Sequence, residues 1–297
     1  MVLSTVNREI CVAPIEGQEG PYGYTPSLAA GIVFCALFGF AMLLHTFTSV
    51  RYRVWWQLVF TVGALTEVIG WAGRTWSSQC PFMTTPFLIQ ITTLIIAPAF
   101  FTAGIYVILG RLIRTFGPQV SPISANMYLY IFCSADIISL VIQAVGGASA
   151  SVAYQKTPPG NTDNGTHIMV AGILFQLAAI IVFMVLFTVV IMRALRSNDS
   201  ALRQKKVQAI IAATAFSVVC VVIRSIYRTI ELLQGWQGYL ITTQRFFLVL
   251  DGGMMVLALI VFNIVQPKWS EAWKTRGDSS VSELDGITIR GTSRVKA

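Results

Sequence analysis

The sequence predicts an all-α membrane protein, a bundle of seven transmembrane helices with its N-terminus outside and its C-terminus in the cytoplasm. Three observations support this prediction. Of the 297 residues, 55% are hydrophobic and only 11% are charged, whereas a soluble domain is about 25% charged. Seven apolar stretches are each about 20 residues or longer, the length that crosses a bilayer as a helix. Basic residues gather in the connections on one side of that topology.

The apolar stretches set the domain organisation. An extracellular tail of residues 1–24 precedes a transmembrane domain of residues 25–267, and a polar cytoplasmic tail of residues 268–297 has the composition of a disordered segment. The spans fall at about 27–49, 55–75, 86–110, 126–148, 168–192, 207–230 and 244–265. The first tail lacks the apolar region of a cleavable signal peptide, so we expect the first span to act as a signal anchor.

The charges of the connections orient the bundle. Fifteen lysines and arginines fall in the loops and tail on one side, against Arg8 and Lys156 on the other. The positive-inside rule places the basic side in the cytoplasm. The net charge of +8 then belongs to an inner membrane surface facing anionic lipid, and it does not indicate a nucleic-acid partner. We expect an integral, multi-pass protein of the plasma membrane.

Two features concern the outer face. Cys11 and Cys80 both fall outside, where an oxidising compartment would let them form a disulfide bond, and the sequence leaves open whether they pair. The sequon Asn164-Gly165-Thr166 also falls outside, so we expect a glycan at Asn164, although its closeness to the fifth span counts against it. A second sequon, which begins at Asn198, falls in the cytoplasm and should stay unmodified.

Ionisable residues inside the spans are the strongest functional signal. A charge at the centre of a bilayer costs about 2.5–3.5 kcal/mol on insertion scales, so it is paired or lies in a wet cavity. Four acidic and four basic residues lie within or border the spans: Glu67, Arg74, Asp136, Arg224, Arg228, Glu231, Arg245 and Asp251. Because their charges balance, we expect a polar, internally neutralised site inside the bundle.

Depth and spacing bring the polar residues together. At a rise of about 1.5 Å per residue, they share the outer half of the bilayer, with Asp136 near the middle. Residues at i, i+3, i+4 and i+7 share one helix face, and a polar face turns inward because lipid cannot satisfy it. The predicted substrate-binding residues are Glu67, Arg74, Gln90, Asp136, Gln143, Gln176, Arg224, Arg228, Glu231 and Asp251. The alternative is a set of ion pairs that only lock the helices together.

Other residues narrow the possible functions. No G-x-x-x-x-G-K-[ST] motif occurs, which argues against ATP hydrolysis. The two histidines, His45 and His167, lie near opposite membrane faces, so we expect no zinc site and no other metal or cofactor. No lysine lies in a span, so retinal has no attachment point. Pro98 lies inside the third span, where we favour a structural kink over a hinge.

The polar residues belong to a series of short motifs on successive spans. These run through Glu67-Val68-Ile69-Gly70-Trp71-Ala72-Gly73-Arg74, Gln90 with Ala97-Pro98-Ala99-Phe100, Asp136 to Gln143, Gly172 to Gln176, Arg224-Ser225-Ile226-Tyr227-Arg228 with Glu231, and Asp251. In this order they resemble the fungal RTA-like family, also called lipid-translocating exporters, over nearly all of residues 22–270. The chain departs from that family at Gln244, Leu248 and Gln266, where relatives often have an acidic residue, a tyrosine and a histidine.

The resemblance implies export or flipping of an amphipathic small molecule, such as a sphingoid base, a sterol analogue or a toxic metabolite, and it implies no enzyme activity. On this hypothesis Glu67, Asp136 and Asp251 bind a cationic head or a proton, while the arginines neutralise them and the glutamines supply neutral hydrogen bonds. The expected partners are membrane lipids or an amphipathic small molecule, and the sequence identifies no protein partner. The alternative function is a seven-transmembrane sensing receptor for an amphipathic ligand.

Overall fold

The structure is a computed structural model of the chain, and it describes residues 11–13, 20, 22–155, 160–197, 200–235 and 238–265. Within these ranges the chain forms helices and irregular connections, and no strand. Most of the predicted tail 1–24 with Arg8, the loop residue Lys156, the first two positions of the Asn198 sequon, and the predicted tail 268–297 lie outside the described residues.

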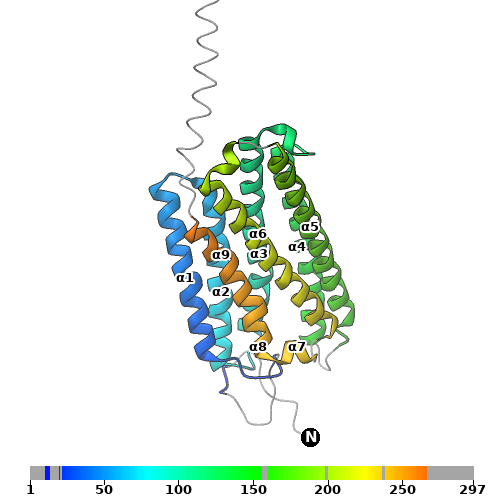
Figure 1. The fold of residues 1–297 in the computed structure, drawn as a ribbon. Helices are drawn as coiled ribbons and strands as arrows, with labels where there is room; N and C mark the ends of the chain where they lie inside the picture. The colour runs from blue at the N-terminus through cyan, green and yellow to red at the C-terminus, as the bar shows by residue number, and fades with distance from the viewer. Residues whose placement is uncertain are drawn as a thin grey trace, which may run out of the picture.

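Long helices run side by side in one bundle (Figure 1). The helices are α1 (Leu28–Arg51), α2 (Leu58–Gln79), α3 (Thr84–Phe116), α4 (Ala125–Gln155), α5 (Asp163–Arg196) and α6 (Lys205–Leu233). The last crossing consists of α7 (Tyr239–Thr242), α8 (Gln244–Phe246), the π-helical η4 (Phe247–Gly253) and α9 (Met254–Ile264). Short turns, η1 (Trp55–Gln57), η2 (Pro118–Val120) and η3 (Ser200–Arg203), precede α2, α4 and α6. The predicted seventh span is therefore not a regular α-helix throughout.

Six helices of the described chain are long and apolar enough to cross a membrane. They are Leu28–Arg51, Thr84–Phe116, Ala125–Ala153, Asp163–Arg196, Lys205–Leu233 and Gln244–Ile264. The prediction of an all-helical membrane protein is therefore confirmed, with six candidate spans in the described chain. The 22-residue α2 is not one of the six, because Glu67, Arg74 and several small polar residues lower its mean hydropathy. It packs against both α1 and α3.

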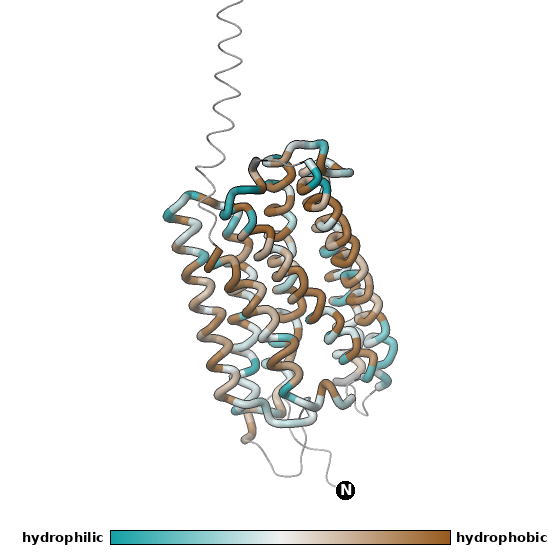
Figure 2. The backbone as a smooth tube through the Cα atoms, viewed as in Figure 1, coloured by the Kyte–Doolittle hydropathy of each residue, from teal (hydrophilic) through white to brown (hydrophobic). Residues whose placement is uncertain are grey.

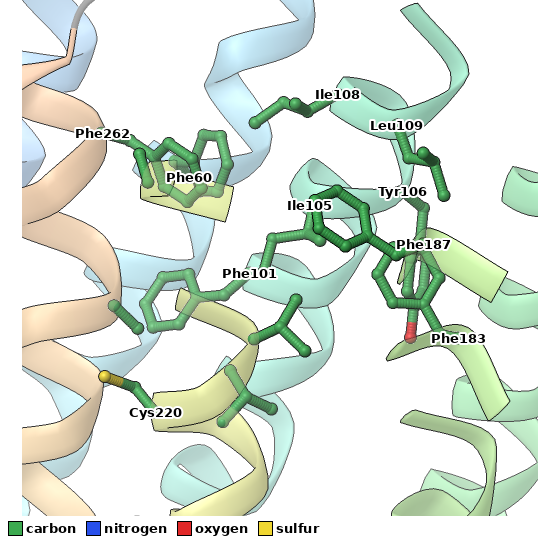
Figure 3. Close-up of a cluster of buried hydrophobic side chains, with 14 of the residues drawn as sticks. Phe60, Phe101, Ile105, Tyr106, Ile108, Leu109, Phe183, Phe187, Cys220 and Phe262 are labelled. Carbon is green, nitrogen blue, oxygen red and sulfur yellow. The ribbon is translucent and has the colours of Figure 1, made fainter. Parts of the chain in front are cut away.

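The bundle is apolar on its outside as well as inside (Figure 2). Large side chains such as Phe40, Phe47 and Ile137 are more than half exposed, as expected when the surrounding solvent is lipid. The interior holds a continuous aromatic and aliphatic core in which Phe60, Phe101, Tyr106, Phe183, Phe187 and Phe262 take part (Figure 3). Apolar surfaces on both sides of the helices indicate an integral, multi-pass membrane protein.

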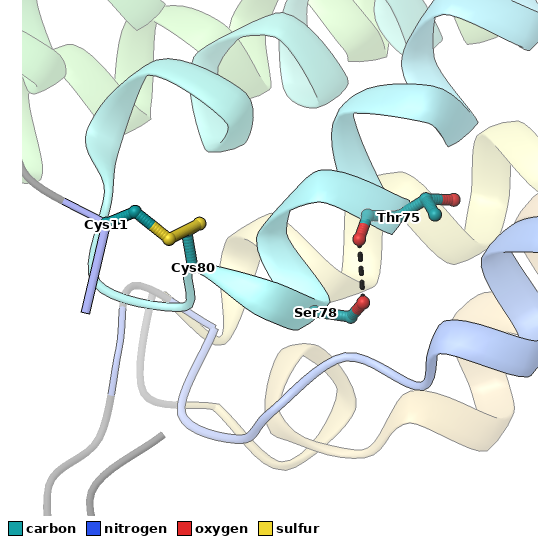
Figure 4. Close-up of a disulfide and its surroundings, with 4 residues drawn as sticks. All are labelled: Cys11, Thr75, Ser78 and Cys80. Atoms are coloured by element: carbon teal, nitrogen blue, oxygen red, sulfur yellow. Dashed lines mark hydrogen bonds between the residues drawn. A yellow bond between two sulfur atoms is a disulfide. The ribbon is translucent and has the colours of Figure 1, made fainter. Parts of the chain in front are cut away.

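A disulfide bond joins Cys11 to Cys80 (Figure 4), with their Cα atoms 4.9 Å apart across a sequence separation of 69. The sequence left this pairing open, and the structure forms it. A bond that closes so long a loop restricts the unfolded chain, and it fastens the N-terminal segment to the C-terminal end of α2. We call this end of the bundle the disulfide end. The opposite end, where α1, α3 and α5 finish with Arg51, Arg114 and Arg196, is the basic end.

Glycine brings α4 and α5 into close contact. A Cβ atom at Gly146 would lie 2.5 Å from the backbone nitrogen of Met169, and one at Gly165 would lie 2.5 Å from that of Ala150. Small residues permit such an approach between membrane helices, where van der Waals packing drives association. The α4–α5 pair therefore depends on the absence of side chains at these two positions.

Gly146→Ala should lower the free energy of unfolding by about 1–3 kcal/mol, because the added methyl group overpacks the α4–α5 contact. Thermal unfolding of the detergent-solubilised protein measures this change. Gly39→Ala is the matched control, since a Cβ at Gly39 meets no atom within 4 Å and alanine favours a helix. Equal unfolding temperatures for the two variants would contradict the close approach.

Candidate functional site

Two arginines of α6 share one carboxylate of the last crossing. Arg224 Nε lies 3.1 Å from Asp251 Oδ1, and Arg228 Nε lies 3.7 Å from the same oxygen. Arg228 Nη1 also donates to Glu231 Oε2 at 2.6 Å. All four side chains are at least nine-tenths buried. We call Arg224, Arg228, Glu231 and Asp251 the charged cluster.

Local helix geometry explains how α6 and η4 build this cluster. Positions 224, 228 and 231 follow the i, i+4, i+7 spacing, so their side chains share the face of α6 that points into the bundle. Tyr227 completes this part of the cluster, because its hydroxyl donates to Glu231 Oε1 at 2.8 Å. Asp251 lies in η4, and π-helical segments of this kind often occur at functional sites.

Arg224 connects the charged cluster to a third helix. Its Nη2 donates to the backbone carbonyl of Leu94 on α3 at 2.5 Å. The guanidinium therefore contacts Asp251 of η4 on one side and the backbone of α3 on another. Hydrogen bonds from a charged donor are roughly twice as strong as neutral ones. Arg224 therefore helps to fix the positions of α6, η4 and α3 relative to one another.

Glu67 of α2 lies near the cluster without joining its ion pairs. The side chain is 1% exposed, and Trp71 Nε1 donates to Glu67 Oε2 at 3.2 Å. Its principal electrostatic interactions are with Arg224, Asp251 and Arg228. Within the described chain, however, no basic side chain comes within ion-pair distance of the Glu67 carboxylate.

The charges of this region do not balance. Three carboxyl groups, those of Glu67, Glu231 and Asp251, face two guanidinium groups, those of Arg224 and Arg228. If all five are ionised, one negative charge is left over. A bound cation or a proton restores neutrality, and a buried charge requires such compensation.

Arg74 is the third buried arginine, and its contacts are neutral. Nη1 lies 3.2 Å from Gln90 Oε1, and Nη2 donates to the Tyr24 hydroxyl oxygen at 2.6 Å. Its guanidinium lies over the Phe247 ring at 4.4 Å and over the Tyr22 ring at 5.3 Å. Cation–π contacts stabilise a desolvated guanidinium. Arg74 therefore does not supply the positive charge that the cluster lacks.

Residues 22–27, the N-terminal strap, cover Arg74 at the disulfide end. The Tyr22 hydroxyl donates to Gln90 Oε1 at 2.8 Å, and burial raises the pKa of Tyr22 to about 12, so the hydroxyl keeps its proton at neutral pH. Gly23 has φ +68, and a Cβ there would lie 2.8 Å from Thr242 Cγ2. The strap also reaches α8, because Ser27 N donates to Gln244 Oε1 at 3.3 Å.

Asp136 of α4 forms a separate polar group. Its Oδ2 accepts hydrogen bonds from Thr102 Oγ1 at 2.7 Å and from the Tyr106 hydroxyl at 3.1 Å, both on α3. In the described ranges no basic residue forms an ion pair with Asp136. Gln143 of α4 has its own partner, since its Nε2 donates to Gln176 Oε1 on α5 at 3.2 Å.

The structure buries nine of the ten predicted site residues and leaves Gln176 half-buried. It groups them as the charged cluster with Glu67 beside it, the Arg74–Gln90 pair, Asp136, and the Gln143–Gln176 pair. The expected single layer is thus divided into separate contacts. Arg245, which borders the last crossing, is exposed and belongs to none of them.

Sequence reasoning missed several partners of these residues. They are Tyr22, Tyr24, Trp71, Leu94, Thr102, Tyr106 and Tyr227. A spacing of four residues links Trp71 to Glu67 and Tyr227 to Glu231, and that signal was available in the sequence. Within the described part of the chain, no group of three His, Cys, Asp or Glu side chains is placed to hold a metal ion.

Comparison with known proteins adds to this geometry. The family model described as RTA1 like protein matches residues 60–272, which include every predicted substrate-binding residue. The sphingoid long-chain base transporter RSB1 of Saccharomyces cerevisiae is 30% identical over 311 residues, covering 92% of this chain and 80% of the relative. Protoporphyrin uptake protein 1 of the same yeast is 30% identical, covering 82% and 90%. Protein RTA1 is 26% identical, covering 83% and 84%. No solved structure matches significantly.

Arg228→Met should lower the free energy of unfolding by about 3–5 kcal/mol, because it leaves Glu231 and part of Asp251 buried without a counter-charge. Thermal or denaturant unfolding in detergent measures the loss. Arg245→Met is the matched control at an exposed position and should change stability by less than about 0.5 kcal/mol. Similar losses for both variants would mean that the buried ion pairs do not stabilise the bundle.

Proposed function

The chain belongs to the RTA1-like family, and from this premise we propose that it moves a lipid-like amphipathic molecule with a cationic head across the membrane. The observation that carries the proposal is the unbalanced charge inside the bundle, three carboxyl groups against two guanidinium groups. An ammonium group supplies the missing positive charge. Its hydrocarbon tail stays in lipid or among apolar side chains.

Glu67 is the proposed acceptor of the ammonium group. It is buried, it has an indole N–H rather than a cation as its hydrogen-bond donor, and it lies beside the cluster. The Trp71 ring stacks on Phe34 at 4.0 Å and lies 5.6 Å from Phe247. Aromatic faces next to a carboxylate favour an organic cation. A sphingoid base, the molecule in the name of one relative, has an amino group on a long hydrocarbon chain.

The remaining polar residues take supporting roles in this proposal. Arg224 and Arg228 form ion pairs with Asp251 and Glu231 next to the substrate head. Gln90 orients Arg74 below the strap, and the Gln143–Gln176 pair fastens α4 to α5. Asp136, which has hydroxyl donors and no cation partner, is the group best suited to carry a proton during transport. The proposed activity is transport and not catalysis.

We further propose that α2 is the seventh span, with the disulfide end outside the cell at the plasma membrane. Twenty-two residues extend about 33 Å as a helix, which matches a hydrocarbon core of about 30 Å. The charged residues of α2, Glu67 and Arg74, are both buried. Basic residues concentrate at the basic end, namely Arg51, Arg53, Arg111, Arg114, Arg193, Arg196, Arg203, Lys205 and Lys206, and this favours a cytoplasmic location. A disulfide bond suits the outside.

Purified protein in liposomes should move a fluorescent sphingoid base between leaflets, and Glu67→Gln should reduce the rate at subsaturating base by roughly 10- to 100-fold. A charge-assisted hydrogen bond of about 1.5–3 kcal/mol accounts for that range. The N-acylated base, which has no positive charge, should not be moved, and Arg245→Gln should retain full activity. Binding without movement would instead support the alternative function, a receptor for an amphipathic ligand.

A glycan at Asn164 tests the orientation. Asn164 is exposed in the first turn of α5, near the disulfide end. Protein from a eukaryotic host should show one shift in gel mobility upon glycosidase digestion, and Asn164→Gln should abolish it. A shift that persists in Asn164→Gln and disappears in Asn198→Gln would place the disulfide end in the cytoplasm.

A further inference from the structure

Pro98 leaves one backbone carbonyl of α3 without its helical donor. In an α-helix the N–H of residue i donates to the carbonyl of residue i−4, and proline has no N–H. Pro98 lies inside α3 (Thr84–Phe116), so the carbonyl that loses its partner is that of Leu94. Leu94 is 1% exposed. A buried carbonyl without a donor is costly, and another group must satisfy it.

Arg224 is that group. Its Nη2 donates to the Leu94 carbonyl oxygen at 2.5 Å, from a side chain that is itself nine-tenths buried. Nε of the same guanidinium lies 3.1 Å from Asp251 Oδ1, as an ion pair. A guanidinium is planar, and its N–H donors have a fixed arrangement. The contacts to Leu94 and Asp251 therefore fix the position of the whole Arg224 guanidinium. Arg224 thereby connects the Leu94 carbonyl, which Pro98 leaves without a helical donor, to the charged cluster.

The position of Arg224 matters because a carboxyl group without an ion-pair partner lies nearby. The charges of Arg224 and Arg228 both act on Glu67, yet Glu67 has no ion-pair partner in the described chain. Without the Leu94 carbonyl, a guanidinium drawn only to carboxylates would move toward Glu67. It would then neutralise the group that is proposed to bind the substrate's ammonium.

We propose that Pro98 is a positioning residue for substrate recognition. Pro98 leaves the Leu94 carbonyl free to accept a hydrogen bond from Arg224. This hydrogen bond keeps the Arg224 guanidinium next to Asp251 and away from Glu67, so Glu67 remains available to a cationic head group. This inference rests on the proposed function. It differs from a simple kink, because a kink acts through helix packing and does not require Arg224.

Pro98→Ala restores the N–H that donates to the Leu94 carbonyl along the helix axis. Alanine favours a helix interior far more than proline does, so the variant should fold. In liposomes, the concentration of labelled sphingoid base that gives half-maximal transport should rise about tenfold or more, with little change in the maximal rate. In an Arg224→Gln background, Pro98→Ala should have no further effect on either quantity.

Pro86→Ala is the matched control. Pro86 lies in the first turn of the same helix and is also buried, but the N–H groups of a first turn have no partner within their helix. Its replacement should therefore leave half-maximal transport unchanged. An equal effect of Pro86→Ala and Pro98→Ala would overturn the proposal, and so would an effect of Pro98→Ala that persists in the Arg224→Gln background.

A second measurement tests the inference without transport. In a double-mutant cycle of Pro98→Ala and Arg224→Gln, followed by thermal unfolding in detergent, the two shifts should be strongly non-additive because the residues act through one hydrogen bond. Additive shifts would overturn the proposal. If the wild-type protein moves no base while the cycle is non-additive, the proposed function fails and the link between Pro98 and Arg224 remains.

Discussion

The polar interior of this protein depends on the Asp251 carboxylate, which two arginines share in a medium without bulk water. A buried ion pair is stable only when its geometry is good and its remaining hydrogen-bonding groups are satisfied. The Leu94 carbonyl and the Tyr227 hydroxyl supply such partners for the cluster. Because both guanidinium groups are engaged in this way, Glu67 remains an acid without an ion-pair partner beside the charged cluster.

Arg74 explains why that imbalance persists. It lies on the same helix as Glu67, and on a simple count of charges it would balance the three carboxyl groups of Glu67, Glu231 and Asp251. The N-terminal strap and Phe247 instead surround it with hydroxyl, amide and aromatic partners. The Cys11–Cys80 bond anchors the chain that leads into this strap. A segment that precedes α1 thus helps to determine the electrostatics of the interior of the bundle.

Backbone irregularity and polar chemistry coincide in two of the spans. Pro98 interrupts the hydrogen bonds of α3 one turn after Leu94, and η4 widens the last crossing where it carries Asp251. Non-helical or distorted backbone at membrane depth persists only where protein groups satisfy it. Arg224 donates to the Leu94 backbone carbonyl of α3, and it forms an ion pair with the Asp251 side chain of η4. Asp136 lies apart from them, bonded to hydroxyl groups of α3, so the residues proposed for head-group recognition and for carrying a proton lie in different places.

The sequence by itself determined the helical membrane fold and the inward position of most polar residues, because hydropathy and the helical period depend only on local order along the chain. Nine of the ten residues that it predicted for the substrate site prove to be buried, and its motifs indicated the family. Tertiary structure decided which residues meet: Arg224 with Leu94 and Asp251, Arg74 with Tyr24, Asp136 with Thr102, and Cys11 with Cys80. Such pairings depend on the rotation, register and backbone irregularities of neighbouring helices, and these follow from packing between segments far apart in the chain.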